Sequence, residues 1–422
     1  MSTAQTIPTE VIQQIFALFS TTFTAHDPAL FPWFLGHVCS RWRSIFLDMT
    51  TEFWHTIHIA FHWEDTSKPA KNLIQFFLEC DPTAPFSFCI RFPGALAKSQ
   101  PHVRDHMRQI LEMLVDESMR WKQISFRVAD TPMTHLLPLT RAKDRLPLLQ
   151  KLQLSYLSYS VPLPLLDVFQ SAPSLNVIQM SNPGNWKFDW STLKVVEVNQ
   201  LGSGTCDFIP ALSQMTNLER LRITSAFRGA VQSDSVVLLP RLAALKCGPS
   251  WLAFLRAPAL TALTLYVGAR KKSNTSDIVL SFLLRSSCNV LHLCITGGEA
   301  AAAVEVVRHT PRITRLELLD VDGVERALEK LIISSDPAQP REPLARHLLS
   351  LHIRSDFKDD IQRVMPRLIS SRTGAAGCKR LQELGVSIPQ FNLAADTIGN
   401  LIALCKERGI HCFDYQRNVS YT

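Results

Sequence analysis

The chain reads Ile313-Thr314-Arg315-Leu316-Glu317-Leu318 in its second half, and the spacing of the apolar residues in this stretch decides the fold. The last two apolar residues lie two apart, so their side chains face the same side of a short strand, and the first lies in the turn that leads in. Eleven units share this spacing, at intervals of 18 to 35 residues. They start at Trp121, Leu149, Leu175, Leu193, Leu218, Leu242, Leu260, Val290, Ile313, Leu348 and Leu381.

Between several of these units the apolar residues follow the spacing of an α-helix instead. Such stretches are residues 163–172, 277–286, 300–309, 324–333 and 359–370. A strand followed by a helix, repeated many times, predicts parallel strands on one face and helices on the other. The sequence therefore predicts an α/β fold built as a solenoid.

This pattern resembles the leucine-rich-repeat family. In that family an Asn or Cys usually follows the third apolar position, and its side chain bonds the backbone of the loop. None of the eleven units has either residue at the corresponding position. We therefore expect an irregular leucine-rich-repeat-like solenoid rather than a smooth horseshoe.

The first sixty residues have a different pattern. Pro8 and Glu10 suit the first turn of a helix, and an apolar stripe from Val11 to Phe19 follows at helical spacing. Residues 21–32 break the pattern, and a second helix is expected at about residues 33–47. Trp54, Ile57 and Ile59 then lead into a strand.

Three motifs in this segment resemble the F-box. They are Ile7-Pro8-Thr9-Glu10-Val11-Ile12 with Ile15-Phe16, then Val38-Cys39-Ser40-Arg41-Trp42-Arg43, then Phe53-Trp54. Ile7 replaces the usual Leu, and the linker at residues 21–32 is longer than in compact F-boxes. The helix–strand–helix–strand order of residues 73–124 extends the likeness to fungal F-box proteins with degenerate leucine-rich repeats. The resemblance implies an F-box at residues 1–60 and a substrate-binding solenoid at residues 61–422.

The family resemblance implies a substrate-recognition adaptor of a Skp–cullin–F-box ubiquitin ligase and no catalysis by this chain. A Skp-family adaptor, and through it a cullin–RING ligase, would bind the N-terminal helices, and an unknown target protein would bind the repeats. The expected adaptor contacts are Pro8, Val11, Ile12, Ile15, Phe16, Val38, Cys39 and Trp42. The alternative is a leucine-rich-repeat interaction scaffold without ligase coupling, in which residues 7–60 form a helical cap. The number of apolar residues on two short helices favours a partner over a cap.

The strand residues that flank the apolar pairs should form the inner surface of the solenoid. Basic residues outnumber acidic ones there, which suggests an acidic or phosphorylated target, with Arg220 and Arg222 forming a pair for it. The alternative is a solvated strand face with no ligand preference. The basic candidates are Arg127, Lys151, Arg220, Arg222, Lys246, Arg315 and Arg354, and the acidic residues are Glu197, Glu317 and Glu383.

Composition argues against several other classes. The chain has 44 Lys and Arg against 37 Asp and Glu, which gives a net charge of +7. Its densest basic run, residues 270–272, is short. Because a nucleic-acid binder concentrates its positive charge in a patch, no nucleic-acid partner is expected. Neither a signal peptide nor a transmembrane helix is apparent, so we expect a cytoplasmic or nuclear protein without a membrane partner. The ten cysteines form no C-x-x-C pair, and nucleotide-binding, zinc-protease and hydrolase motifs are absent. No cofactor or metal is expected, and the protein is not expected to be an enzyme.

Overall fold

The fold was analysed in a computed structural model of the 422-residue chain. The structure describes residues 7–19, 23–24, 31–49, 53–60, 67–92, 101–128, 133–156, 167–181, 186–199, 205–224, 236–268, 275–333, 343–354, 359–374, 378–387, 395–414 and 419–421. The basic run at residues 270–272 lies outside them. Internal contacts divide the chain into two compact units, Met1–Met215 and Thr216–Thr422.

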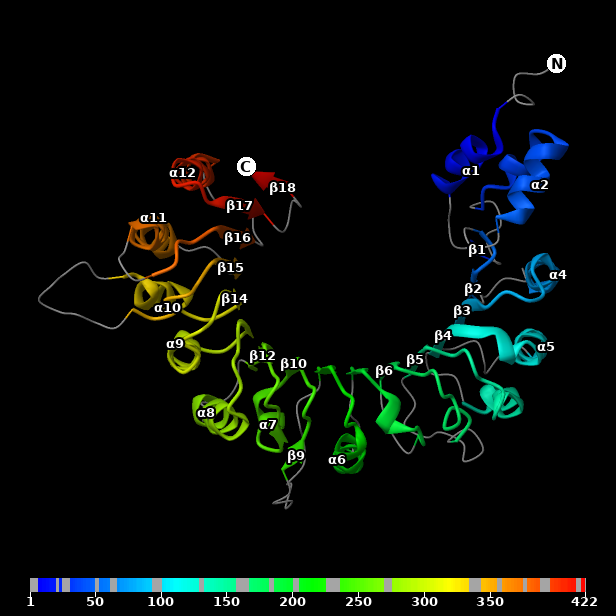
Figure 1. The fold of residues 1–422 in the computed structure, drawn as a ribbon, viewed down its shortest axis with the longest axis horizontal. Coiled ribbons are helices and arrows are strands. Elements are labelled where there is room, and N and C mark those ends of the chain that lie inside the picture. Colours follow the sequence, from blue (N-terminus) through cyan, green and yellow to red (C-terminus); the bar gives the residue numbers. More distant parts are fainter. Residues whose placement is uncertain are drawn as a thin grey trace, which may run out of the picture. The chain divides into compact units, whose positions relative to one another are not determined.

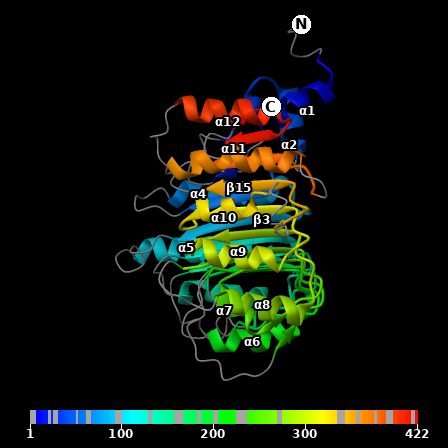
Figure 2. The same ribbon diagram turned by 90° about the vertical axis from the view of Figure 1, so that its left-hand side faces the viewer.

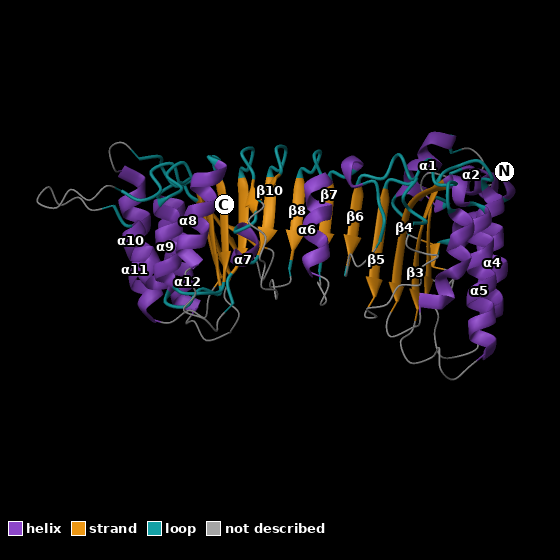
Figure 3. Ribbon diagram, turned by 90° about the horizontal axis from the view of Figure 1, so that it is seen from below, coloured by secondary structure: helices purple, strands orange, loops and turns teal. Residues whose placement is uncertain are grey.

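The first unit contains parallel strands that pair in chain order, β1 to β7. In Figure 3 the arrows of β4, β5 and β6 point the same way. These strands are β1 (Phe23–Thr24), β2 (Thr56–Ala60), β3 (Phe86–Phe92), β4 (Trp121–Val128), β5 (Lys151–Tyr156), β6 (Val177–Met180) and β7 (Val195–Val198). The helices are α1 (Thr9–Ala17), α2 (Ser40–Asp48), α4 (Ser67–Cys80), α5 (Pro101–Asp116) and α6 (Thr205–Gln214), with 3₁₀ segments η3 (Trp33–His37), η5 (Ser118–Arg120), η6 (Met133–Ala142) and η8 (Trp190–Thr192).

The second unit continues the same plan. Its main strands pair in parallel from β8 to β17, and β18 pairs with β17 in the antiparallel direction. These are β8 (Arg220–Ile223), β10 (Ala244–Cys247), β12 (Ala262–Tyr266), β13 (His292–Thr296), β14 (Arg315–Leu319), β15 (Ser350–Arg354), β16 (Glu383–Ser387), β17 (His411–Asp414) and β18 (Val419–Tyr421). A separate parallel pair joins β9 (Val237–Leu238) and β11 (Leu255–Arg256).

Helices of the second unit cover one side of its strands (Figure 1). From the side, α9 to α12 lie one above another (Figure 2), and neighbouring helices contact each other. The helices are α7 (Pro249–Leu252), α8 (Thr275–Ser286), α9 (Ala300–Arg308), α10 (Val324–Leu331), α11 (Asp359–Gly374) and α12 (Ala395–Glu407). Strand, return helix and next parallel strand alternate here, which confirms the α/β repeat solenoid that the sequence predicts.

The core lies between the strands and the helices. All three apolar positions of every one of the eleven units are buried, and the most exposed of them, Val386, has only 7% of its surface accessible. Each such side chain contributes about 1.5–3 kcal/mol when it is fully buried. Burial of the whole set confirms that the recurring apolar spacing marks the strands.

Two helix predictions need correction. The expected second helix at residues 33–47 is two pieces, η3 and α2, because Cys39 is extended (φ −161°, ψ 172°) and forms the N-cap of α2. Apolar periodicity continues across the break and therefore does not reveal it. Within the expected helix at residues 163–172, residues 167–171 are turns, and residues 163–166 lie outside the described part of the chain.

One tight turn depends on glycine. Gly297 and Gly298 follow β13 with φ of +74° and +77°, a region that residues with a Cβ rarely adopt. A Cβ on Gly297 would overlap the backbone carbonyl of Val267, so this turn packs directly against the loop after β12.

Candidate functional site

The strands of the second unit present a polar face on the side opposite the helices. Side chains alternate along a strand, so the residues on either side of each buried apolar residue point to this face. The register aligns them in rows across neighbouring strands. One row is His292, Arg315, Ser350 and Glu383, and the next is Cys294, Glu317, His352 and Gly385.

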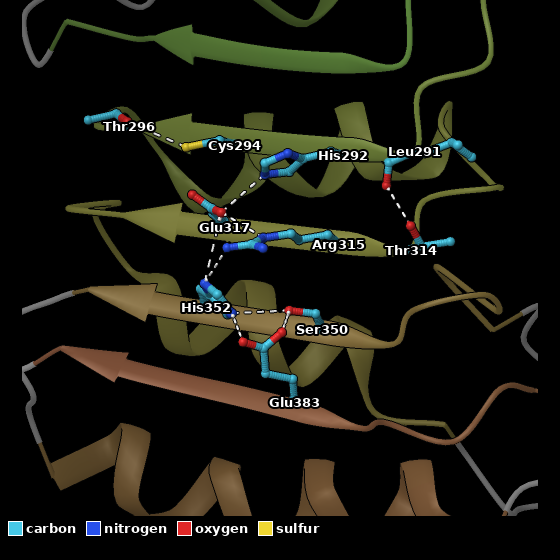
Figure 4. Close-up of polar contacts among 10 residues, drawn as sticks. All are labelled: Leu291, His292, Cys294, Thr296, Thr314, Arg315, Glu317, Ser350, His352 and Glu383. Carbon is cyan, nitrogen blue, oxygen red and sulfur yellow. Dashed lines mark hydrogen bonds and ion pairs between the residues drawn. The ribbon is translucent and has the colours of Figure 1, made fainter. Parts of the chain in front are cut away.

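Glu317 is the centre of a polar cluster on this face (Figure 4). Its Oε1 lies 3.1 Å from His292 Nε2 on β13 and accepts a hydrogen bond of 2.9 Å from Arg315 Nε on its own strand. Arg315 Nη2 also lies 3.2 Å from His352 Nδ1 on β15. The cluster thus joins three adjacent strands through their side chains.

His352 extends the cluster to β16. Its Nε2 lies 3.1 Å from Ser350 Oγ and 3.2 Å from Glu383 Oε1, and Ser350 Oγ donates a 2.8 Å hydrogen bond to Glu383 Oε2. The side chain of His352 is only 4% exposed, so its ring is held by these partners on both nitrogens.

The electrostatics of the cluster follow from these contacts. The hydrogen bond from His292, assisted by the charges of His292, Arg315 and His352, lowers the pKa of Glu317 to about 2 although burial opposes the shift. Burial lowers the pKa of His352, and Arg315 lowers it further, which together outweigh the two glutamates. Burial would raise the pKa of Glu383, but Ser350 and His352 lower it overall.

Ser350, His352 and Glu383 have the side-chain types of a hydrolase catalytic triad. In a triad the histidine lies between the nucleophile and the acid, which contact different ring nitrogens. Here Ser350 and Glu383 both approach Nε2, the hydroxyl donates to Glu383, and Nδ1 faces Arg315. Ser350 is also only 8% exposed. These contacts instead link side chains of neighbouring strands, and the polar cluster centred on Glu317 is called the clamp below.

Two residues of the predicted basic face already form ion pairs with carboxylates. Arg315 pairs with Glu317, and Arg354 forms two hydrogen bonds with Asp320, at 3.1 and 2.5 Å. Asp320 follows β14, outside the strand positions from which the basic excess was predicted. Arg315 and Arg354 therefore already have carboxylate partners within the protein.

The other candidate basic residues lie on strands of both units. Arg220 and Arg222 flank the buried Leu221 on β8, and Lys246 on β10 is in register with Arg222. In the first unit, Arg127 is exposed on β4 and Lys151 is half-exposed on β5.

Two residues on the strand face of the first unit were missed by the sequence analysis. They are His58 on β2 and Arg91 on β3, and both are exposed. Arg91 is in register with Arg127. The missed signal was the alternation of Phe86, Phe88 and Ile90, which places Arg91 on the opposite face.

The helical pair α1 and α2 forms the second candidate surface. Phe16 packs edge-on against Trp42 and Phe46, with ring centroids 5.1 and 6.2 Å apart, and Arg41 Nη2 donates a hydrogen bond to Thr9 Oγ1. Ile12 and Phe16 have no exposed surface. The expectation that these two contact a partner directly is therefore corrected, because they form the core of the pair.

Several other predicted contact residues are accessible. Pro8 is exposed and precedes α1 as its N-cap, while Ile15, Cys39 and Trp42 are half-exposed. Val11 and Val38 are 41% and 49% exposed. Three large apolar residues that the sequence analysis had not named as contacts are exposed as well, and two of them touch with ring centroids 5.6 Å apart. They are Leu18, Phe19 and Phe34.

Comparison with known proteins gives little beyond this geometry. No family model matches the chain, and no curated protein does either. Solved chains match, among them one described as "Crystal structure of TLR13-ssRNA13 complex", with a TM-score of 0.31 and 12% identity. The match covers 66% of this chain and 48% of that one, about half its length.

The described part of the chain also lacks two other kinds of site. Its side chains include no group of three or more His, Cys, Asp or Glu placed to hold a metal ion. None of its helices combines the length and the apolar character that crossing a bilayer requires.

Proposed function

We propose that this chain is a protein-binding adaptor that holds two partners at once. One is a Skp-family protein, bound by the N-terminal helical pair, and the other is a target protein, bound by the strand face. In this proposal the chain is the substrate-recognition subunit of a Skp–cullin–F-box ubiquitin ligase in the cytoplasm or nucleus.

One observation carries the proposal. The described residues of the N-terminal segment 7–49 bury Ile12, Phe16 and Phe46, yet leave large apolar side chains exposed. They are Val11, Leu18, Phe19, Phe34 and Val38. Exposed apolar surface concentrated on one small element is characteristic of a docking site. Val11 and Val38 belong to two of the three motifs that resemble the F-box.

Such an adaptor would work without chemistry of its own. Holding a target beside a ubiquitin-loaded enzyme raises the effective concentration of the target's lysines, which makes an otherwise bimolecular encounter intramolecular. A solenoid suits this role because its strand face presents an extended row of side chains to a partner.

The test uses exposed residues only, because variants of Ile12 or Phe16 would disturb the core of the pair. We expect the double variant Val11→Asp/Val38→Asp to weaken copurification with a Skp-family protein by roughly a hundredfold, since it removes apolar contact and places two charges in the interface. The matched control is Leu284→Asp on α8, which is 79% exposed and should bind normally.

The alternative function is an interaction scaffold without ligase coupling. It shares the strand face but needs no Skp-family protein, so the same experiment separates the two. If the Val11→Asp/Val38→Asp variant copurifies as well as the Leu284→Asp control, the ligase proposal is wrong and the scaffold remains.

A further inference from the structure

The strand face of the first unit places two like charges side by side. Arg91 on β3 and Arg127 on β4 are paired in register, and both side chains are exposed. Neighbouring strands lie about 4.8 Å apart, so these guanidinium groups share one small area of surface. Like charges at directly opposed positions destabilise a sheet, so such a pair needs an explanation.

No carboxylate on the surrounding strands offsets this charge. The sequences of β2, β3, β4 and β5 contain neither Asp nor Glu, and no described carboxylate forms an ion pair with Arg91 or Arg127. The second unit shows the opposite arrangement, since its Arg315 and Arg354 are each matched by an acidic side chain. Among the described residues, Arg91 and Arg127 therefore have no carboxylate partner, which leaves their charge for a ligand.

His58 on β2 borders the same area. It is in register with Cys89, two residues before Arg91 on β3. Burial lowers the pKa of His58, and the positive charges of Arg127 and Arg91 lower it further. Both arginines therefore act on one point of the face.

We propose that Arg91 and Arg127 bind a phosphoserine or phosphothreonine of an extended protein segment, with His58 at the edge of the site. The planar guanidinium group donates two parallel hydrogen bonds to phosphate oxygens, and two such groups one strand apart can bind the same phosphate. Uncharged side chains of the neighbouring strand positions surround the pair. These neighbours are Ser87, Cys89, Gln123, Ser125 and Ser155.

A nucleic acid also carries phosphates, but the face suits it less well. Proteins that bind single strands add aromatic side chains on which the bases stack. Among the described face residues of β2 to β5, His58 is the one ring, and the aromatic residues Phe86, Phe88, Trp121 and Phe126 are buried on the other side. A phosphorylated protein segment is therefore the favoured ligand.

This inference adds to the proposed function the chemical group by which the target is recognised. It rests on the proposed function only for what happens to the target after binding. Binding is measured on the purified full-length chain without a ligase. The probes are a peptide library with random flanking residues and a fixed central phosphoserine, the same library with serine, and single-stranded oligo(dT).

We expect the phosphoserine library to bind roughly tenfold or more tightly than the serine library, and the preference to vanish in Arg91→Glu/Arg127→Glu. The milder Arg91→Gln/Arg127→Gln variant should lose it too while keeping the size of the side chains. The matched control, Arg241→Glu/Arg312→Glu, changes the charge equally at exposed turns outside the strands and should keep the preference.

Equal binding of the two libraries, or an unchanged preference in the Arg91/Arg127 variants, would overturn the inference. Oligo(dT) binding that depends on the two arginines and exceeds phosphopeptide binding would also overturn it, in favour of a nucleic-acid site. Copurification with a Skp-family protein is scored separately and should be unaffected by every variant in this set. Failure of the phosphate site is thereby distinguished from failure of the adaptor proposal.

Discussion

Glu317→Gln removes the one charge on which the clamp between β13, β14 and β15 is centred. The amide keeps the shape of the side chain but can no longer offer a carboxylate to His292 and Arg315. Glu317 is 18% exposed, so its contacts are only partly screened by solvent. We therefore expect the stability of this variant to fall because the charge is lost, and not because the packing changes.

The magnitude follows from the pKa of Glu317. A fall from the usual 4.5 to about 2 means that folding favours the carboxylate. Each unit corresponds to about 1.4 kcal/mol, so the charge stabilises the fold by at most about 3 kcal/mol, part of which depends on charged histidine partners. Because the folded pKa is the lower one, this contribution is complete above the unfolded value of 4.5 and is lost as the pH falls through 2. About half should remain at pH 3.

The assay is urea unfolding of the wild type and the variant at a series of pH values between 7 and 3. The difference in unfolding free energy should be about 2–3 kcal/mol at pH 7 and should shrink steadily below pH 4.5. Glu305→Gln is the control, because Glu305 forms ion pairs with Arg308 and His309 at the surface of α9, worth less than about 1 kcal/mol. A difference for Glu317→Gln that does not change with pH would refute the electrostatic explanation.

Two further predictions concern buried and strained positions. Arg372 on α11 is 1% exposed and donates hydrogen bonds to the backbone carbonyls of Leu331, Leu344 and Ala345. We therefore expect Arg372→Met to lower the unfolding free energy by about 3–5 kcal/mol in the same urea assay. A loss below about 1 kcal/mol would contradict the role of these hydrogen bonds. Gly297→Ala should lower the stability of the fold by about 2 kcal/mol or more in thermal melting, because Gly297 has a positive φ and its added Cβ would overlap the Val267 carbonyl. The control Gly268→Ala has open space around its Cβ position and should be nearly neutral. Equal effects of the two changes would count against strain at Gly297.

Much of the fold was predictable because parallel strands need two apolar side chains on the same side. Leu263 and Leu265 illustrate this, since their spacing alone predicts a strand and both are buried on β12. Periodicity failed where the backbone changes direction without a change of pattern. Leu35, Val38 and Trp42 continue one helical stripe, but the extended backbone at Cys39 ends the first segment there. The break also leaves Val38 exposed.

The strand face was predictable only in part, because charge counts do not show which charges are paired. The sequence predicts Arg354 as a basic residue available to a target, but the structure places Asp320 beside it as an ion-pair partner. The opposite error concerned Arg91. It lies on a strand without the recurring apolar spacing, and the pairing of that strand with β4 has a register irregularity at Phe86 and Ser87, so no repeat search would include it. Its pairing with Arg127 is a property of the sheet and is not visible along the chain.

The antiparallel strand β18 has a consequence for how copies of this chain behave in solution. Stacked parallel strands leave an outermost strand with unpaired backbone groups, which could add a strand from another molecule and start a linear polymer. Here the three residues of β18 fold back onto β17 in the opposite direction and occupy that edge. A reversed and very short last strand is a poor template for another parallel strand. Among the described strands the ladder ends at β18, and its short length and reversed direction disfavour end-to-end growth from this edge.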